Sequence, residues 1–569
     1  MSGRARRVIS GLAGAAALIA AITVVSRVVG FGRWFAQSSA LGQTATGTAY
    51  ATANQLPNVL FEVVAGGALA GAIVPLLAGP LAKNLRGDVD RIASALLTWA
   101  LAVLLPASIL LGLLAGPLVG LLIPAARPGD DPAVAAATLE LASRLLVVFA
   151  PQVVLYGVGV VLTGILQAQR RFAWPAAAPL ASSVVVIASY LVFASMAGGA
   201  VTDPDALSDQ AVAWLGWGTT AGVAAMSLPL VVPVLRSGVR LRPTLGFPPG
   251  VGARARHLAL AGIGGLLAQQ GAVLVVVRLA NFRGAAAGGT INIFQYAQAV
   301  YFLPYAVLAV PLATAAFPRL AEHAATGDLL RYGRLVAAST RGVLLVSAAG
   351  AAALVAAAPA VAHVFAAVDA SNDPQALGAM TPTLVLLAPG LLGYALIFQH
   401  SRVLFALERG RAAVVSIAIG WLAVVVASIV AVLVLTPDGA DGPAALRGLA
   451  IGNTIGMTVA GLALLVAVRR CAGPPALAGT SRTLAVAVGG AALGAVAGRW
   501  VVDAALGFTD RGIDSAVVAG LGGAALSAVV VVAATWVADR STISGALAAD
   551  RRGPRPGAPG AVRGEDPRD

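Results

Sequence analysis

Three arginines lie within long apolar runs of the sequence, where a charged side chain is costly. Arg27 and Arg33 stand six residues apart in the first run, and Arg278 follows three consecutive valines in a later one. An unpaired arginine at mid-membrane costs at least about 2.5–3.5 kcal/mol on insertion scales, so each one needs water, a partner or a bound anion. The guanidinium fork binds phosphate oxygens through two parallel hydrogen bonds. If the three arginines face one central cavity, they form a binding site for a substrate that carries phosphate or another anionic group.

The carboxylates inside apolar runs have more than one interpretation. Glu62 either pairs with an arginine or binds a coupling ion, and we favour pairing. Glu140 and Arg144 are four residues apart, so on a helix they share a face, and the simplest interpretation is that they neutralise each other.

Other chemistry is not indicated by the sequence. It contains no Gly-x-x-x-x-Gly-Lys-Ser/Thr loop for a nucleotide. Its one cysteine, Cys471, excludes an internal disulfide and a multi-cysteine metal site. The histidines are scattered along the chain at His257, His323, His363 and His400. We therefore expect no cofactor, no metal site and no enzymatic activity.

Long apolar segments must position these side chains. A helix that crosses about 30 Å of hydrocarbon needs roughly 20 predominantly apolar residues. The first two such segments are too long for simple spans, which predicts bends near Gly30, Pro57 and Gly66–Gly67. Fourteen segments are predicted, near 9–40, 45–82, 92–124, 133–167, 173–198, 211–235, 257–282, 290–318, 342–367, 380–406, 412–436, 445–468, 482–506 and 514–538.

The composition agrees with a chain that lies largely in a membrane. Of its 569 residues, 59% are hydrophobic and 11% are charged, with a mean hydropathy of +0.88. Soluble domains are roughly 45–50% apolar and about 25% charged, so a water-soluble multidomain enzyme is excluded. Disorder, collagen and coiled coils are excluded as well, because the apolar sequence is continuous and lacks their periods. The predicted fold class is an all-α polytopic membrane protein.

The loops between the segments alternate in charge. Lysine and arginine outnumber aspartate and glutamate by 38 to 24, a formal net charge of +14. The basic residues fall before the first segment and after every second one, whereas the other loops carry aspartates such as Asp130 and Asp373. The positive-inside rule then predicts that both termini are cytoplasmic. Because the excess of arginine follows the topology, no nucleic-acid partner is expected.

An internal repeat indicates two lobes. A shift of 238 residues pairs Ala150-Pro151 with Ala388-Pro389, and Tyr156 with Tyr394. These residues lie in the fourth and tenth segments, an even number apart, which indicates a parallel repeat about the membrane normal and a transporter that works by alternating access. The predicted domains are two six-helix lobes around a central cavity, 1–242 and 243–476, then two extra helices in 477–540 and a disordered cytoplasmic tail in 541–569.

The first two segments resemble a known family. Residues 26–33 (SRVVGFGR) and 49–58 (AYATANQLPN) are similar to the opening of the MurJ/MviN family of lipid II flippases. Residues 67–68, 73–75 and 388–391 continue the likeness, which extends to the twelfth segment. The resemblance implies the fold of the MOP flippase superfamily, with a central cationic cavity. It also implies transport of lipid II, an undecaprenyl-diphosphate-linked peptidoglycan precursor, from the inner to the outer leaflet of a bacterial plasma membrane.

The resemblance also bears on individual residues. Arg27 and Arg33 fall on motif arginines that the family uses in its cavity, and the motif positions expected to act as hinges are Gly30, Pro57, Asn58 and Gly67. The sequence departs from the family pattern at Thr48, where an acid is expected, at Phe61-Glu62, where basic residues are common, and at Ala299, where an arginine is expected. We expect Arg278 to supply the charge missing at Ala299.

Two alternatives to a lipid II flippase remain open. One is another exporter of the same superfamily, which moves drugs or polysaccharide by ion antiport. The other is a degenerate paralogue that acts as a scaffold for cell-wall assembly. The expected partners are a polyprenyl-diphosphate lipid substrate, membrane lipids and, for the scaffold in particular, cell-wall synthesis proteins.

Overall fold

Every regular element of the computed structural model is a helix within the residues it describes, which are 3–63, 70–126, 130–261, 263–285, 288–371, 377–508 and 512–539. This confirms the all-α fold class. The predicted tail, Gly67 and Asp373 lie outside the described residues.

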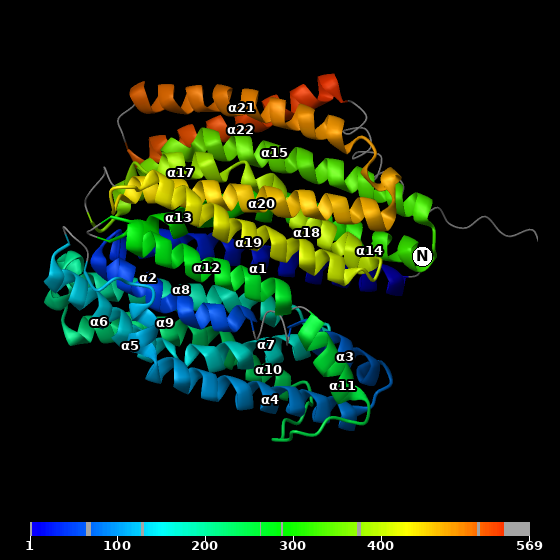
Figure 1. Ribbon diagram of the computed structural model, residues 1–569. Helices are drawn as coiled ribbons and strands as arrows, with labels where there is room; N and C mark the ends of the chain where they lie inside the picture. The colour runs from blue at the N-terminus through cyan, green and yellow to red at the C-terminus, as the bar shows by residue number, and fades with distance from the viewer. Residues whose placement is uncertain are drawn as a thin grey trace, which may run out of the picture.

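The first ten helices form one bundle, which we call the N-terminal lobe (Figure 1). They are α1 (Gly3–Ala40), α2 (Ala45–Phe61), α3 (Ala70–Ala82), α4 (Arg86–Leu113), α5 (Ala115–Gly120), α6 (Pro132–Phe149), α7 (Gln152–Ala168), α8 (Ala173–Ala197), α9 (Asp209–Ser227) and α10 (Val231–Leu235). Within this lobe α1 packs on α8, α2 on α6, and α4 on α7. Helix α11 (Val251–Ala261) contacts α3 and lies in the connection to the second bundle.

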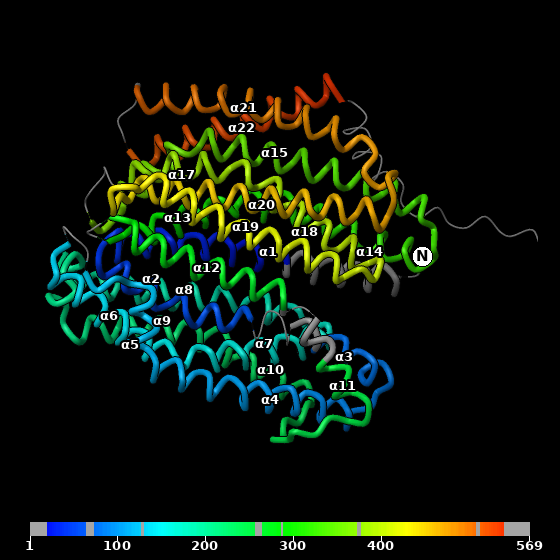
Figure 2. The backbone as a smooth tube through the Cα atoms, in the orientation of Figure 1, coloured from blue at the N-terminus to red at the C-terminus, as the bar shows by residue number. Residues whose placement is uncertain are grey.

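The second bundle is the C-terminal lobe, made of α12 (Ile263–Arg283), α13 (Thr290–Pro304), the π-helical turn η5 (Tyr305–Ala309), α14 (Val310–Ala325), α15 (Leu329–Val368), α17 (Met380–Leu387), α18 (Gly390–Ala406), α19 (Gly410–Leu435) and α20 (Gly442–Ala472). Two further helices, α21 (Thr480–Phe508) and α22 (Ile513–Ala538), pack on each other and on α15 at the edge of the molecule (Figure 1). Helix α1 lies between the lobes and also contacts α13 and α15 (Figure 2).

All fourteen predicted segments coincide with helices. Within the described residues, eleven helices are long and apolar enough to span a membrane, and a twelfth is obtained if α17 and α18, which meet at a 46° bend, count as one span. The two remaining predicted segments correspond to α1 and to α2 with α3, which border or include residues outside the described part. The total of fourteen, and the domain boundaries derived from it, stay predictions.

The predicted bends at Gly30 and Pro57 do not coincide with interruptions of a helix. Helix α1 continues through Gly30 without interruption. Gly30 lies where α1 approaches α8, and a Cβ there would be 3.7 Å from the Ser183 hydroxyl. Helix α2 likewise continues through Pro57 and ends at Phe61. A helix can bend without being interrupted, so the predicted bends at Gly30 and Pro57 stay predictions.

Helices are interrupted at corresponding places in the two lobes. The helix pair α6–α7 is interrupted at Ala150-Pro151, and α17–α18 is interrupted at Ala388-Pro389. After each pair, the residue two positions beyond the last helical residue adopts a left-handed backbone, with φ 61° at Arg170 and 58° at Glu408. These positions are 238 residues apart, which is the shift of the sequence repeat.

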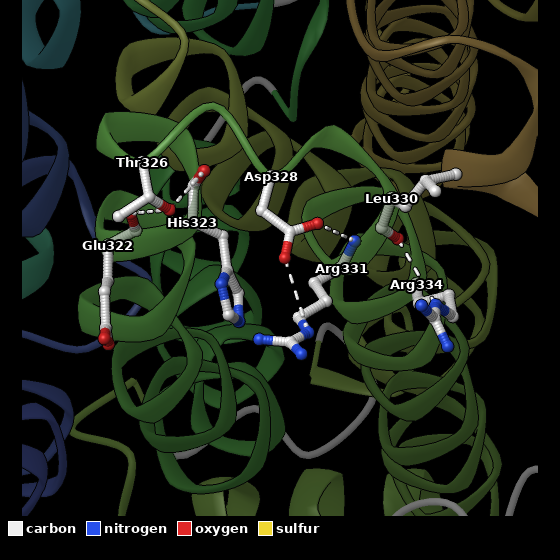
Figure 3. Close-up of polar contacts among 7 residues, drawn as sticks. All are labelled: Glu322, His323, Thr326, Asp328, Leu330, Arg331 and Arg334. Atoms are coloured by element: carbon white, nitrogen blue, oxygen red, sulfur yellow. Dashed lines mark hydrogen bonds and ion pairs between the residues drawn. The ribbon is translucent and has the colours of Figure 1, made fainter. Parts of the chain in front are cut away.

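The turn between α14 and α15 shows how short polar contacts end and begin these helices (Figure 3). The Thr326 hydroxyl donates to the Glu322 carbonyl at the end of α14. The Asp328 carboxylate then accepts from the Arg331 backbone N–H at 3.0 Å and forms an ion pair with its guanidinium at 3.3 Å. A side-chain acceptor of this kind satisfies an N–H group that has no partner within the helix.

Glycines allow α19 and α20 to touch backbone to backbone. Gly448, Gly452 and Gly456 recur every fourth residue on α20, so they share one face. A Cβ at Gly452 would lie 2.5 Å from the Cα of Ser428, and one at Gly456 would lie 2.6 Å from the nitrogen of Val424. Small residues of this kind let membrane helices associate by close van der Waals packing.

Candidate functional site

A cavity of about 290 Å³ lies between the two lobes. Helices α1, α2, α7, α8 and α9 supply the walls on the N-terminal side, and α13 supplies the wall on the C-terminal side. Among its described lining residues Arg33 is the one with a charged side chain, and the others include Asn58 and Ala299. The cavity is therefore cationic and polar.

Arg33 is half-buried on α1 and close to a group of aromatic hydroxyls. Its charge acts on the hydroxyls of Tyr50, Tyr156 and Tyr190, which line the same cavity. Its guanidinium also lies 5.8 Å from the centre of the Trp34 ring. Within the described chain Arg33 forms no ion pair with a carboxylate, so its charge is available to a bound anion.

A buried hydroxyl network stiffens the wall opposite α13. The Tyr50 hydroxyl is 2.8 Å from that of Tyr190 and 3.1 Å from that of Thr219. Tyr190 in turn donates to the side-chain oxygen of Gln37 at 3.4 Å. These side chains join α1, α2, α8 and α9 into one surface, whose polar atoms already have protein partners.

Arg27 lies about 9 Å before Arg33 along α1, given a rise of about 1.5 Å per residue. It is exposed, and its charge acts on the hydroxyl of Tyr305 in η5 of the other lobe. Arg402 on α18 acts on the same hydroxyl. The Tyr305 hydroxyl is thus influenced by the charge of one arginine from each lobe.

Arg402, near the end of α18, is a further arginine within an apolar segment, which the sequence interpretation missed. Its guanidinium donates to the Thr314 hydroxyl at 2.8 Å and lies 3.9 Å from the centre of the Phe398 ring. The signal was present, since Arg402 is an arginine within the apolar segment 380–406. It was overlooked because it lies near the end of that segment, where the loop arginines begin.

The expectation that three arginines converge in the cavity of Arg33 is not met: neither Arg27 nor Arg278 is among its described lining residues, and Arg278 contacts other groups. Arg278 lies near the end of α12, where its guanidinium donates to the Leu121 carbonyl of the N-terminal lobe and stacks 4.0 Å from the centre of the Phe282 ring. Because α12 ends at Arg283, only five residues separate Arg278 from the end of the bundle. It therefore does not replace the charge missing at Ala299.

The acidic residues also differ from the simplest expectation. Glu62 is half-buried just after α2, and its charge acts on the Tyr394 hydroxyl. It forms no ion pair with an arginine in the described part of the chain. Arg144 is paired with Asp209 of α9 at 2.6 Å rather than with Glu140, because α9 brings that carboxylate alongside α6.

The lobes are joined at the end where α1 turns into α2. The Asp369 carboxylate, at the end of α15, accepts from the Ser38 hydroxyl at 2.7 Å and from the Gln43 backbone N–H at 3.4 Å. Thr48, the residue that replaces a family acid, accepts from the Gly289 N–H at 2.6 Å. We call these contacts the latch; its further members are Ala370 to the Ser38 carbonyl, Asn292 to Gly42, Asn281 to Thr52 and Leu122, and Arg278 to Leu121.

A second cavity, of about 650 Å³, adjoins the latch. It is lined by turns from both lobes, including Thr44, Asp130, Asp131 and Gly442. The loops in which the sequence analysis found aspartates therefore meet at one end of the molecule, which we call the acidic end. The opposite end, where the arginine-bearing loops lie, is the basic end. The latch closes the space between the lobes at this end.

Comparison with known proteins identifies this architecture. The family model described as "Lipid II flippase MurJ" matches residues 37–507. The chain belongs to the MurJ family. The probable lipid II flippase MurJ of Synechocystis sp. is 31% identical over 253 residues, which are 44% of this chain and 45% of that protein. The match thus spans less than half of that relative. The family resemblance predicted from residues 26–33 and 49–58 is confirmed.

Solved structures agree on the fold. A structure of the lipid II flippase MurJ in an inward closed conformation superposes with a TM-score of 0.69 at 18% identity, over 92% of this chain and 99% of that one. An inward-facing multidrug resistance MATE family transporter of the MOP superfamily superposes with a TM-score of 0.62 at 17% identity, over 80% of this chain and 98% of that one. At such identities these likenesses establish the fold alone: the chain shares its helical architecture with both structures.

Proposed function

We propose that this protein is a lipid II flippase, which carries an undecaprenyl-diphosphate-linked peptidoglycan precursor from the inner to the outer leaflet. The observation that carries the proposal is the match to the MurJ family over residues 37–507, together with a cationic cavity between the lobes. It also rests on the placement of the chain in a bacterial plasma membrane with both termini cytoplasmic, as the alternating loop charges predict.

The arginines of both lobes would grip the diphosphate. Arg33 lines the cavity from α1 of one lobe. The charges of Arg27, on the same helix, and of Arg402, in the other lobe, both act on the Tyr305 hydroxyl. A diphosphate offers several charged oxygens, which suits guanidinium groups arranged at different depths. In this proposal Arg402, and not Arg278, is the third arginine that binds the diphosphate.

The latch indicates the end of the protein from which the substrate reaches the cavity. In the state described here the lobes are hydrogen-bonded at the acidic end, so the substrate would reach the cavity from the basic end. A substrate that contacts both lobes shifts the equilibrium only if it binds one arrangement of the lobes more tightly than the other. Arginines on both lobes meet this condition, because their spacing changes when the lobes rotate. Glu62, which has no arginine partner among the described residues, would find one or bind a coupling ion in the opposite state.

The test is complementation with matched transport measurements. In cells depleted of their own lipid II flippase, the chain should restore growth and shape, and the purified protein in vesicles should move lipid II between leaflets. Growth without translocation would favour the cell-wall scaffold. Translocation of drugs or polysaccharide, with no movement of lipid II, would favour the MOP-type antiporter. Either result would refute the proposal.

A further inference from the structure

The cavity beside Arg33 contains a group of amide side chains with no protein partner. Asn54 and Gln55 project from α2, and Gln295 and Gln298 project from α13. Each is half-buried. None of these four side chains makes a hydrogen bond to another described residue, in contrast to the neighbouring tyrosine hydroxyls, which are bonded to one another. Each amide therefore presents two donors and one acceptor to whatever fills the cavity.

The amides face aromatic rings in the same cavity. Trp34, Tyr156 and Phe302 contribute rings to the lining, and no described lining residue carries a carboxylate. A pocket without carboxylates gives no counter-charge to a cationic drug. Aromatic surfaces combined with a few convergent hydrogen-bonding groups bind neutral, ring-shaped polar ligands. A sugar has this character, since its ring has apolar faces and its edge carries hydroxyl groups.

The size of the cavity limits what part of the substrate it holds. Its volume of about 290 Å³ is at the lower end of the roughly 300–1,000 Å³ range of small-molecule sites. The cavity thus has room for a part of a large lipid headgroup. Because Arg33 lines the same cavity, the part held here is the part joined directly to the phosphate.

We propose that Asn54, Gln55, Gln295 and Gln298 form a subsite that holds the first sugar attached to the diphosphate, by hydrogen bonds to its hydroxyl and N-acetyl groups. This inference rests on the proposed function and specifies which residues recognise the saccharide as distinct from the phosphate. The amides come in pairs from opposite lobes, so a sugar bound to all four bridges the lobes. Recognition of the sugar is in this way coupled to their relative position.

The test compares two lipid probes on the full-length protein in nanodiscs. One probe is undecaprenyl diphosphate, which has no sugar, and the other is lipid II. Gln55→Leu and Gln298→Leu keep the size of the side chain and remove its hydrogen-bonding groups, one on each lobe. Each should weaken lipid II binding about fivefold, the effect of about one lost hydrogen bond, and should leave undecaprenyl diphosphate binding unchanged. Arg33→Gln should weaken the binding of both probes.

The control is Gln269→Leu, which changes a half-buried glutamine of α12 that does not line the cavity. It should alter neither affinity, and equal melting temperatures would show that the variants are folded. If one glutamine variant fails to fold, the other still decides the question. Equal weakening of both probes, or unchanged binding of lipid II, would overturn the sugar subsite and leave the proposed function standing. Failure of the unsubstituted protein to bind either lipid would overturn both.

Discussion

Removal of the Asp369 carboxylate should open the acidic end of the protein. Asp369 is 5% exposed and accepts four hydrogen bonds. Those from the Ser371 hydroxyl and N–H are local to the C-terminal lobe, so they persist when the lobes separate. Those from Ser38 and Gln43 cross between the lobes and are lost on opening. Only the crossing pair contributes to the difference in free energy between the closed and open states.

The magnitude follows from the geometry of that pair. A hydrogen bond to a charged group contributes about 1.5–3 kcal/mol, and the 2.7 Å bond from Ser38 belongs in this class. The 3.4 Å bond from Gln43 is too long to add much. Asp369→Ala should therefore destabilise the closed state by about 2 kcal/mol, which shifts the ratio of closed to open molecules about thirtyfold.

The assay is the distance between spin labels at the acidic end. The chain has one cysteine, the exposed Cys471, so Cys471→Ser gives a background for Asp205→Cys in one lobe and Asp438→Cys in the other. Asp369→Ala should move the distance distribution to longer values in this background. The control is Asp441→Ala, which removes a helix cap within the C-terminal lobe without a contact between lobes. An unchanged distribution in a folded Asp369→Ala protein would refute the latch.

Three further predictions concern single residues. Arg33→Lys should lower lipid II translocation about tenfold per folded molecule, because lysine keeps the charge and loses the two-pronged geometry; normal specific activity would contradict a phosphate-binding role. Arg278→Ala should lengthen the same spin-label distance, since the hydrogen bond from Arg278 to Leu121 crosses between the lobes. It should leave the affinity for undecaprenyl diphosphate unchanged; weaker binding would show that Arg278 contacts the diphosphate after all. Gly452→Val should destabilise the protein by about 1–3 kcal/mol through overpacking, seen as a lower melting temperature, whereas Gly489→Ala, with no atom within 4 Å of the added carbon, should not.

The sequence was sufficient for features that depend on local pattern. Runs of apolar residues predicted where the helices lie. The Ala-Pro pairs at 150–151 and 388–389 indicated the repeat, and the structure shows that helices are interrupted at both, where proline cannot donate a backbone hydrogen bond. The interior arginines Arg27 and Arg33 were found because charges are rare in such runs.

Features that depend on long-range packing were not accessible in the same way. Arg144 was assigned to Glu140 by its spacing, but α9 brings Asp209 closer. Arg278 was placed at the cavity because its apolar neighbours gave no measure of depth, although its distance from the end of α12 would have indicated the acidic end. The latch combines Ser38 with Asp369, which are 331 residues apart and are ordinary residues in their local sequence.

The glycines of α20 explain how the fold is preserved while the sequence diverges between relatives. A position that faces lipid accepts any apolar side chain of moderate size, so most of the surface is free to diverge between relatives. Gly448, Gly452 and Gly456 have no such freedom, because the backbone of α19 occupies the space that any side chain would need. A small number of fixed positions can then preserve the arrangement of helices while identity falls to the 18% seen against the lipid II flippase MurJ structure. Searches for distant members of the family should therefore weigh the spacing of small residues more heavily than the identity of the large apolar ones.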